Sequence, residues 1–153
     1  MLKPGDRVPD FRLPDQEGRE VSLAALLAQG PFVLYFYPAD FTPGCTREAC
    51  RVRDLHAELL QAGLRVVGVS PQDSASHARF RERHQLPFPL LADVDKQLVR
   101  ACGVDGPLGF GVRRASFLVG ADGVIRDAVL ADFRIGRHAS FLRKAMELER
   151  AGA

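Results

Sequence analysis

The sequence predicts an α/β fold in which a central mixed β-sheet is flanked by helices, with a β-hairpin added at the N-terminus. Two continuous apolar runs, residues 32–37 and 64–70, are typical of strands buried on both faces of a sheet. Helical periodicity between and after them implies parallel pairing through right-handed crossovers. Two later apolar segments, 115–119 and 124–130, are joined through residues 121–123, a hairpin signal that predicts antiparallel pairing.

The other elements follow from local signals. Turn-rich residues 14–18 separate two short extended segments and predict the N-terminal hairpin, and Ser22 is placed to cap a short helix. A long helix is expected from near Pro43 to about Ala62, where Gly63 ends it. The remaining expectations are a helix at 74–84, an irregular segment or short strand at 86–91, a helix from an Asp93 cap through Cys102, a loop at 103–113 and a closing helix at 136–151. This pattern matches the thioredoxin-like fold, as a single domain over residues 1–153.

Composition excludes several classes of function. Lys and Arg number 21 against 19 Asp and Glu, and they are spread along the 153 residues, so no nucleic-acid partner is expected. No segment approaches the roughly 18 apolar residues of a membrane span, and residues 1–6 lack a signal-peptide core, which predicts a cytoplasmic protein. Three cysteines are too few for a secreted disulfide scaffold, so a close pair is expected to be catalytic or metal-binding.

The close pair is Cys45 and Cys50, at the point where a buried strand gives way to a helix. Unpaired N–H groups and the helix dipole stabilise a thiolate in the first turn, and the thiolate is the form that attacks a peroxide or a disulfide. We therefore expect Cys45 to be reactive and accessible to small reactants. Thr42, three residues earlier, can accept a hydrogen bond from the helix N-terminus or bond the sulfur and a bound peroxide.

The spacing of the pair constrains its chemistry. Five residues along an intact helix give a rise of about 7.5 Å and a Cα separation of roughly 8–9 Å. A disulfide needs less than about 7 Å, so a Cys45–Cys50 bond requires the first turns of the helix to unwind. Cys50 could instead pack in the core while another group resolves Cys45. Cys102, in apolar surroundings, is expected to be a small buried side chain.

These residues carry a resemblance to a known family. The segment Pro38-Ala-Asp-Phe-Thr42-Pro-Gly-Cys45 is similar to the Pro-x-x-x-Thr/Ser-x-x-Cys motif of peroxiredoxins. A second cysteine five residues on resembles the bacterioferritin-comigratory-protein (PrxQ) subfamily, an atypical two-cysteine type. Residues 5–11 resemble the start of the family, and residues 114–123 resemble its Arg-x-Ser/Thr-Phe-Leu hairpin.

The resemblance implies a role for each matching residue. Cys45 would be the peroxidatic cysteine and Cys50 the resolving one. Thr42 would bond the peroxide, Pro38 would shield the sulfur, and Arg114 would hold the thiolate and polarise the O–O bond.

Two roles stay open beside these. Arg113 is an alternative to Arg114, although the Ser-Phe-Leu that follows favours Arg114. Glu48 could bond the active-site arginine or only solvate the helix.

The implied activity is a thiol-dependent peroxidase that reduces hydrogen peroxide and organic hydroperoxides through a sulfenic acid and an intramolecular disulfide. Thioredoxin or a glutaredoxin-like dithiol protein would recycle it. No metal, flavin or haem is required, and the subfamily is usually monomeric.

Two alternatives were weighed against this activity. A thioredoxin-type disulfide oxidoreductase would carry Cys-x-x-Cys, whereas four residues separate this pair. A metal-binding module would use Cys45, Cys50 and His56, but lacks a second close cysteine pair. The remaining histidines, His77, His84 and His138, lie in polar stretches and are predicted at the surface.

Overall fold

The computed structural model describes residues 1–131 and 136–151. The strands are β1 (Arg12–Pro14), β2 (Glu20–Ser22), β3 (Phe32–Phe36), β4 (Arg65–Ser70), β5 (Leu90–Ala92), β6 (Ala115–Val119) and β7 (Ile125–Leu130). The helices are α1 (Leu23–Leu27), α2 (Pro43–Gln61), α3 (Ser74–His84), α4 (Gln97–Ala101) and α5 (Gly136–Ala151), with a 3₁₀ helix at Pro107–Gly109.

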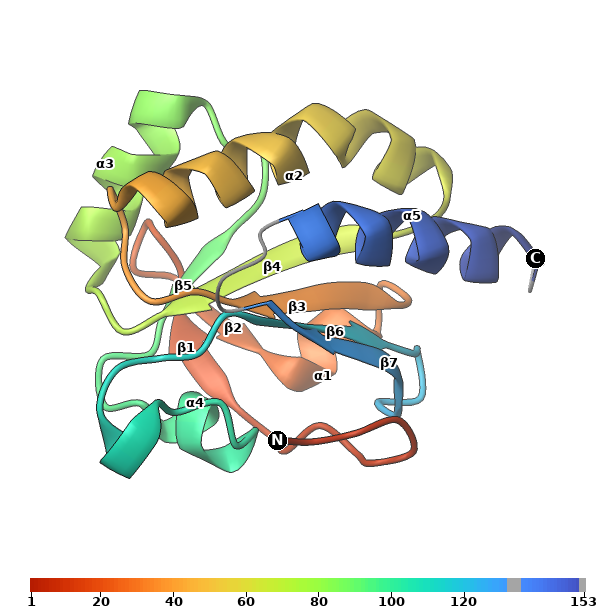
Figure 1. Cartoon of the computed structure of the whole chain (residues 1–153), viewed down its shortest axis with the longest axis horizontal. Coiled ribbons are helices and arrows are strands. Elements are labelled where there is room, and N and C mark those ends of the chain that lie inside the picture. Colours follow the sequence, from red (N-terminus) through yellow and green to blue (C-terminus); the bar gives the residue numbers. More distant parts are fainter. Residues whose placement is uncertain (132–135, 152–153) are drawn as a thin grey trace.

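A five-stranded sheet in the order β5-β4-β3-β6-β7 forms the centre of the molecule. β3, β4 and β5 are parallel, whereas β6 runs antiparallel to both β3 and β7. Helices α2, α3 and α5 lie on one side of the sheet, and α1 and α4 lie on the other (Figure 1). The predicted mixed sheet between helices is therefore confirmed.

The two faces of β3 support two separate cores, because alternate side chains of a strand point to opposite sides. Phe32, Leu34 and Phe36 belong to the core beneath α1 and α4. Val33 and Tyr35 belong to the core beneath α2 and α5. All five are at most 2% exposed, as expected for a strand covered on both faces.

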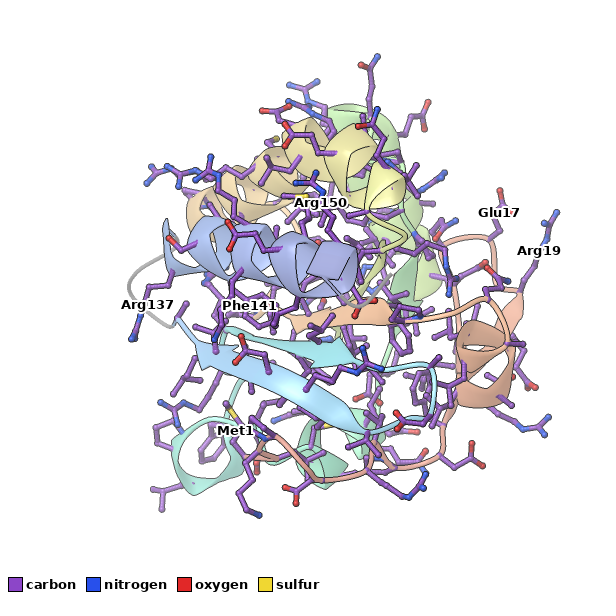
Figure 2. All side chains as sticks on the ribbon, turned by 90° about the vertical axis from the view of Figure 1, so that its right-hand side faces the viewer. Met1, Glu17, Arg19, Arg137, Phe141 and Arg150 are labelled. Carbon is purple, nitrogen blue, oxygen red and sulfur yellow. The ribbon has the colours of Figure 1, made fainter. Side chains whose placement is uncertain are left out.

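The predicted N-terminal hairpin is present, with Arg12 opposite Ser22 in the β1–β2 pair. Ser22 then caps α1 by accepting a hydrogen bond from the Ala25 N–H at 3.1 Å. Glu17 and Arg19 in the hairpin turn point to solvent, while Phe141 of α5 lies between its helix and the sheet (Figure 2).

The helix expected from an Asp93 cap is shorter than predicted. Lys96, whose φ of 58° places it in the left-handed region, occupies the N-cap position of α4 without a side-chain capping bond, and Asp93 lies three residues earlier. The Asp93 carboxylate still accepts the Val99 N–H at 2.8 Å, because a turn closed by the Lys96 N–H and the Asp93 carbonyl brings the chain back over it. Within the described ranges, no helix is both long and apolar enough to cross a membrane.

Candidate active site

The sheet topology brings a distant arginine to the start of α2. Because β6 runs antiparallel to β3, its first residue Ala115 pairs with Phe36, the last residue of β3. Arg114 precedes Ala115, so it lies at the same edge of the sheet as residues 37–42, the loop that leads from β3 into α2. This register therefore brings Arg114 to Cys45, which lies 69 residues earlier in the sequence.

Cys45 lies in the first turn of α2, as predicted, but its side chain is only 1% exposed. The expectation of an accessible sulfur is wrong in this conformation. Cys45, Ala49 and Val52 recur at helical spacing on the face that packs against the sheet, so the thiol points inward. Arg114 Nη1 donates to Cys45 Sγ at 3.2 Å, which places a positive charge against this sulfur.

Arg114 also contacts Glu48, one turn further along α2. Its Nη1 lies 3.5 Å from Glu48 Oε1, and the Glu48 side chain is only 1% exposed. Of the two roles left open for Glu48, the structure favours the bond to arginine over solvation of the helix. The guanidinium, itself 8% exposed, is thus shared between a sulfur and a carboxylate in a buried site.

Thr42 and Pro38 lie on the loop above this group. Thr42 is the N-cap by position, but its hydroxyl donates to the Ala39 carbonyl at 3.1 Å and caps nothing. Of the two roles that the sequence allows this hydroxyl, the capping bond is absent, and the tight turn at residues 39–42 is the reason. Pro38 lines a groove of about 640 Å³ together with Phe110, which is 78% exposed, and Arg113. The groove is an apolar surface next to the loop that carries the predicted site.

Cys50 is half-buried one and a half turns beyond Cys45, and both are free thiols. Its Sγ lies 4.0 Å from His84 Nδ1 at the end of α3. Cys102 is buried in the core on the opposite face of the sheet from Cys45. Cys102 is therefore the small buried side chain that was predicted, and burial, reinforced by the nearby charge of Asp93, raises the pKa of its thiol to about 12.

A second group of polar side chains, centred on Asp40, holds the same loop. Asp40 is 8% exposed, and its carboxylate accepts hydrogen bonds from Tyr37, Ser76 and His77. Burial alone would raise the pKa of Asp40, but the hydrogen bond and charge of His77, with the two hydroxyl donors, hold it below its ordinary value.

The prediction that His77 lies at the surface is wrong, because its side chain is fully buried. His84 is half-buried, and the side chain of His138 lies outside the described residues. A signal for His77 was available in the sequence. It stands three residues before Phe80, which places both on the inward face of one helix.

The comparisons with known proteins now decide the family. The AhpC/TSA family profile matches residues 4–128. The chain belongs to the AhpC/TSA family. The peroxiredoxin Bcp of Escherichia coli is 43% identical over 143 residues, which are 90% of each chain.

Solved peroxiredoxin structures share the whole fold. Peroxidoxin BcpB of Mycobacterium tuberculosis is 40% identical, with a TM-score of 0.89 over 99% of this chain and 98% of that one. Peroxiredoxin Q of Xanthomonas campestris is 30% identical, with a TM-score of 0.84 over 97% and 96%. The predicted resemblance, the thioredoxin-like fold and the enzyme class, a thiol-dependent peroxidase, are confirmed.

The arrangement of the side chains does not support the metal-binding alternative. Within residues 1–131 and 136–151, no three His, Cys, Asp or Glu side chains gather to hold a metal ion. His56, expected as a third ligand, contacts the ring of Phe88 instead, and the histidine next to Cys50 in this peroxiredoxin is His84.

Proposed function

We propose that Cys45 is the peroxidatic residue of this peroxidase. The observation that carries the assignment is the 3.2 Å contact from Arg114 Nη1 to Cys45 Sγ inside a buried site. The thiolate attacks the terminal oxygen of a hydroperoxide, the O–O bond breaks, and the other oxygen leaves as water or an alcohol after taking a proton. The product on the enzyme is the Cys45 sulfenic acid. The guanidinium stabilises negative charge on sulfur before the attack and on the departing oxygen during it.

Cys50 is proposed as the resolving residue. Its thiol condenses with the sulfenic acid, the S–S bond forms, and the hydroxyl of the sulfenic acid leaves as water. The reacting sulfurs cannot meet along an intact helix, because five residues separate their Cα atoms by roughly 8–9 Å. Since α2 is continuous from Pro43 to Gln61 in this structure, resolution requires its first turns to unwind.

Pro38 and Thr42 complete the proposed site. Pro38 borders the groove and limits the approach to the sulfur from that side. Thr42 is proposed to bind the peroxide when its hydroxyl turns from the Ala39 carbonyl toward the substrate.

The substrates are proposed to include hydrogen peroxide and organic hydroperoxides. The groove beside Pro38 and Phe110 offers an apolar surface for the organic group of an alkyl hydroperoxide. A solved relative, the bacterioferritin comigratory protein of Xanthomonas campestris, is described as having alkyl peroxide reduction activity. Comparing the rate constants for cumene hydroperoxide and hydrogen peroxide in Phe110→Ala and the wild type tests this surface. We expect only the organic substrate to slow.

The partner in recycling is proposed to be thioredoxin or a glutaredoxin-like dithiol protein, acting in the cytoplasm. An internal resolving cysteine needs no second subunit, so the enzyme is proposed to work as a monomer and as a single domain. Sedimentation of the reduced and oxidised protein tests this, since a disulfide-linked dimer after peroxide treatment would contradict it.

The central experiment is peroxide consumption with dithiothreitol as reductant. Cys45→Ser is expected to abolish turnover, and Cys102→Ser, which changes a residue on the opposite face of the sheet, is the matched control. Cys50→Ser is expected to form the sulfenic acid but no internal bridge, which mass spectrometry after trapping with dimedone would reveal. Full turnover by Cys45→Ser would overturn the assignment of the peroxidatic residue, and a Cys45–Cys102 bridge in the wild type would overturn that of the resolving residue.

A further inference from the structure

The Asp40 carboxylate accepts hydrogen bonds from three donors. The Tyr37 hydroxyl lies 2.6 Å from Oδ1, and Oδ2 accepts from the Ser76 hydroxyl and His77 Nδ1, each at 2.7 Å. Asp40 belongs to the loop after β3, whereas Ser76 and His77 belong to α3. The carboxylate therefore ties the loop that precedes Cys45 to a neighbouring helix.

The ring of His77 faces an acceptor at each nitrogen. Nδ1 faces the Asp40 carboxylate, and Nε2 lies 3.0 Å from the Leu91 carbonyl of β5. Only an imidazole with a hydrogen on both nitrogens can donate to both. Among the described residues, the groups that contact the pair are the Tyr37 hydroxyl from the loop after β3, the Ser76 hydroxyl from α3 and the Leu91 carbonyl from β5, and none of these three is charged. The geometry thus describes a buried imidazolium–carboxylate pair.

The same loop is held a second time through its backbone. The Asp40 N–H donates to Gln72 Oε1 at 3.1 Å, and Gln72 Nε2 donates to the Pro38 carbonyl at 3.3 Å. Between this anchor and the start of α2 stands Phe41, with a φ of 65°. A non-glycine residue in the left-handed region is strained, and it persists only where its surroundings hold it. Releasing Asp40 would let this strain relax at the residue next to the helix N-cap.

We propose that the Asp40–His77 pair is a latch that holds the first turns of α2 folded and so sets the rate at which Cys50 reaches the Cys45 sulfenic acid. The proposal rests on the proposed function, in which Cys45 and Cys50 form the internal disulfide. Both residues are positioning residues, since they act on Cys45 through the loop and touch no reacting atom. The closed latch favours attack on peroxide, which needs the folded site, and the open latch favours resolution, which needs the unwound helix.

The proposed latch affects the competition between two reactions of the sulfenic acid. Condensation with the Cys50 thiol gives the disulfide and water, whereas a second peroxide oxidises the sulfenic acid to the sulfinic acid and leaves as water. A weaker latch therefore speeds the first reaction and protects against the second. Loss of one hydrogen bond to a charged group would change the equilibrium between the folded and the unwound first turns of α2 by roughly tenfold or more.

The test uses Asp40→Asn, with Asp95→Asn, an exposed carboxyl on another loop, as the matched control. The enzyme is mixed with one equivalent of hydrogen peroxide, quenched at intervals and analysed by mass spectrometry. Asp40→Asn is expected to form the disulfide roughly tenfold faster or more, and to give less sulfinic acid when peroxide is in excess. Asp95→Asn should match the wild type. Wild-type rates in Asp40→Asn, or more sulfinic acid, would overturn the latch.

A second variant keeps the proposal testable if Asp40→Asn does not fold. His77→Gln retains a donor for Asp40 but has no charge, and it should shift the two reactions in the same direction. A merely destabilised protein would lose attack on peroxide and resolution together. If the wild type itself forms no Cys45–Cys50 bridge, the proposed function fails and the latch with it, whereas a normal bridge with unchanged variants overturns the latch alone.

The charge on the pair can be observed directly. In ¹⁵N-labelled protein at pH 7, the ring signals that disappear in His77→Gln are expected to show hydrogen on both nitrogens. A neutral ring, with one unprotonated nitrogen, would overturn the charged pair.

Discussion

Replacing Arg114 by Gln removes the cation that contacts the sulfur of Cys45, the proposed peroxidatic residue. The guanidinium is 8% exposed and its Nη1 lies 3.2 Å from Cys45 Sγ. A hydrogen bond to a charged group contributes about 1.5–3 kcal/mol. If the whole contribution acts on the thiolate and the transition state, the second-order rate constant with hydrogen peroxide should fall roughly 10- to 150-fold, at about 1.36 kcal/mol for each factor of ten.

The same change disturbs the fold, because Glu48 is 1% exposed and loses a buried cationic partner. Breaking such a pair costs about 3 kcal/mol of folding free energy. The double variant Arg114→Gln with Glu48→Gln removes both charges and should recover most of that loss. We expect it to be nearly as stable as the wild type and still slow with peroxide.

The assay is competition for limiting hydrogen peroxide against a reference peroxidase, alongside urea unfolding followed by circular dichroism. Arg126→Gln is the matched control, since it removes a surface ion pair with Glu149 that contributes less than about 1 kcal/mol. A double variant of wild-type stability that reacts with peroxide at the wild-type rate would refute the role of the guanidinium.

Three further predictions concern other residues. In the folded protein at pH 8, iodoacetamide should label half-buried Cys50 and leave Cys102 unmodified, because burial raises the pKa of Cys102 to about 12; rapid labelling of Cys102 would contradict this. Since the pKa of Asp40 is lowered on folding, its contribution to the free energy of unfolding is complete above the unfolded value of about 3.9 and is lost as pH falls through the folded pKa. The stability difference between wild type and Asp40→Asn in urea should therefore shrink in acid, and a constant difference would argue against it. Leu108→Gly should raise the free energy of unfolding by up to about 1 kcal/mol, because Leu108 is 96% exposed with a φ of 56°; a decrease would show that the side chain packs.

Elements with strong local signals were predictable from the sequence. The helix at Ser74–His84 follows an Asp73 cap whose carboxylate accepts from the Ser76 N–H, and its bounds agree with the prediction. The Ser22 cap and the turn at residues 121–123 were predicted for the same reason. Each depends on residues within a few positions of one another, so no knowledge of the tertiary structure is needed.

Contacts that depend on strand register could not be predicted from local sequence signals. The sequence alone offered Arg113 or Arg114 as the partner of Cys45, and the resemblance favoured Arg114. The physical reason for the choice is the pairing of Ala115 with Phe36. The contact of His77 with Asp40, 37 residues earlier, was likewise beyond local reasoning, although the spacing of His77 from Phe80 signalled that it faces inward. The Thr42 bond to the Ala39 carbonyl, in contrast, is local and competes with the helix cap.

In the proposed cycle α2 is folded for the attack on peroxide and unwound for disulfide formation, and the composition of its first turns is suited to both. Between residues 43 and 50 the buried side chains are Cys45, Glu48 and Ala49, which are small or polar. The larger apolar anchors of the helix, Val52 and Leu59, follow later. Unwinding the first turns therefore exposes little apolar surface and costs much less than unfolding the domain.

What holds these turns is instead polar and directional: the Arg114 bonds to Cys45 and Glu48, and the Asp40 anchor on the preceding loop. In the proposed cycle, conversion of the Cys45 thiolate to a sulfenic acid would remove the negative charge that Arg114 contacts, so the attack on peroxide would itself weaken one of the two restraints. The Asp40 anchor is then the main barrier to unwinding. On this argument, Asp40→Asn should accelerate conversion of the sulfenic acid to the disulfide by a similar factor in the wild-type background and in Arg114→Gln with Glu48→Gln, because the first restraint is weak or absent in both. A clearly smaller acceleration in the wild-type background would show that Arg114 still holds the first turns of α2 after oxidation, and would contradict this argument.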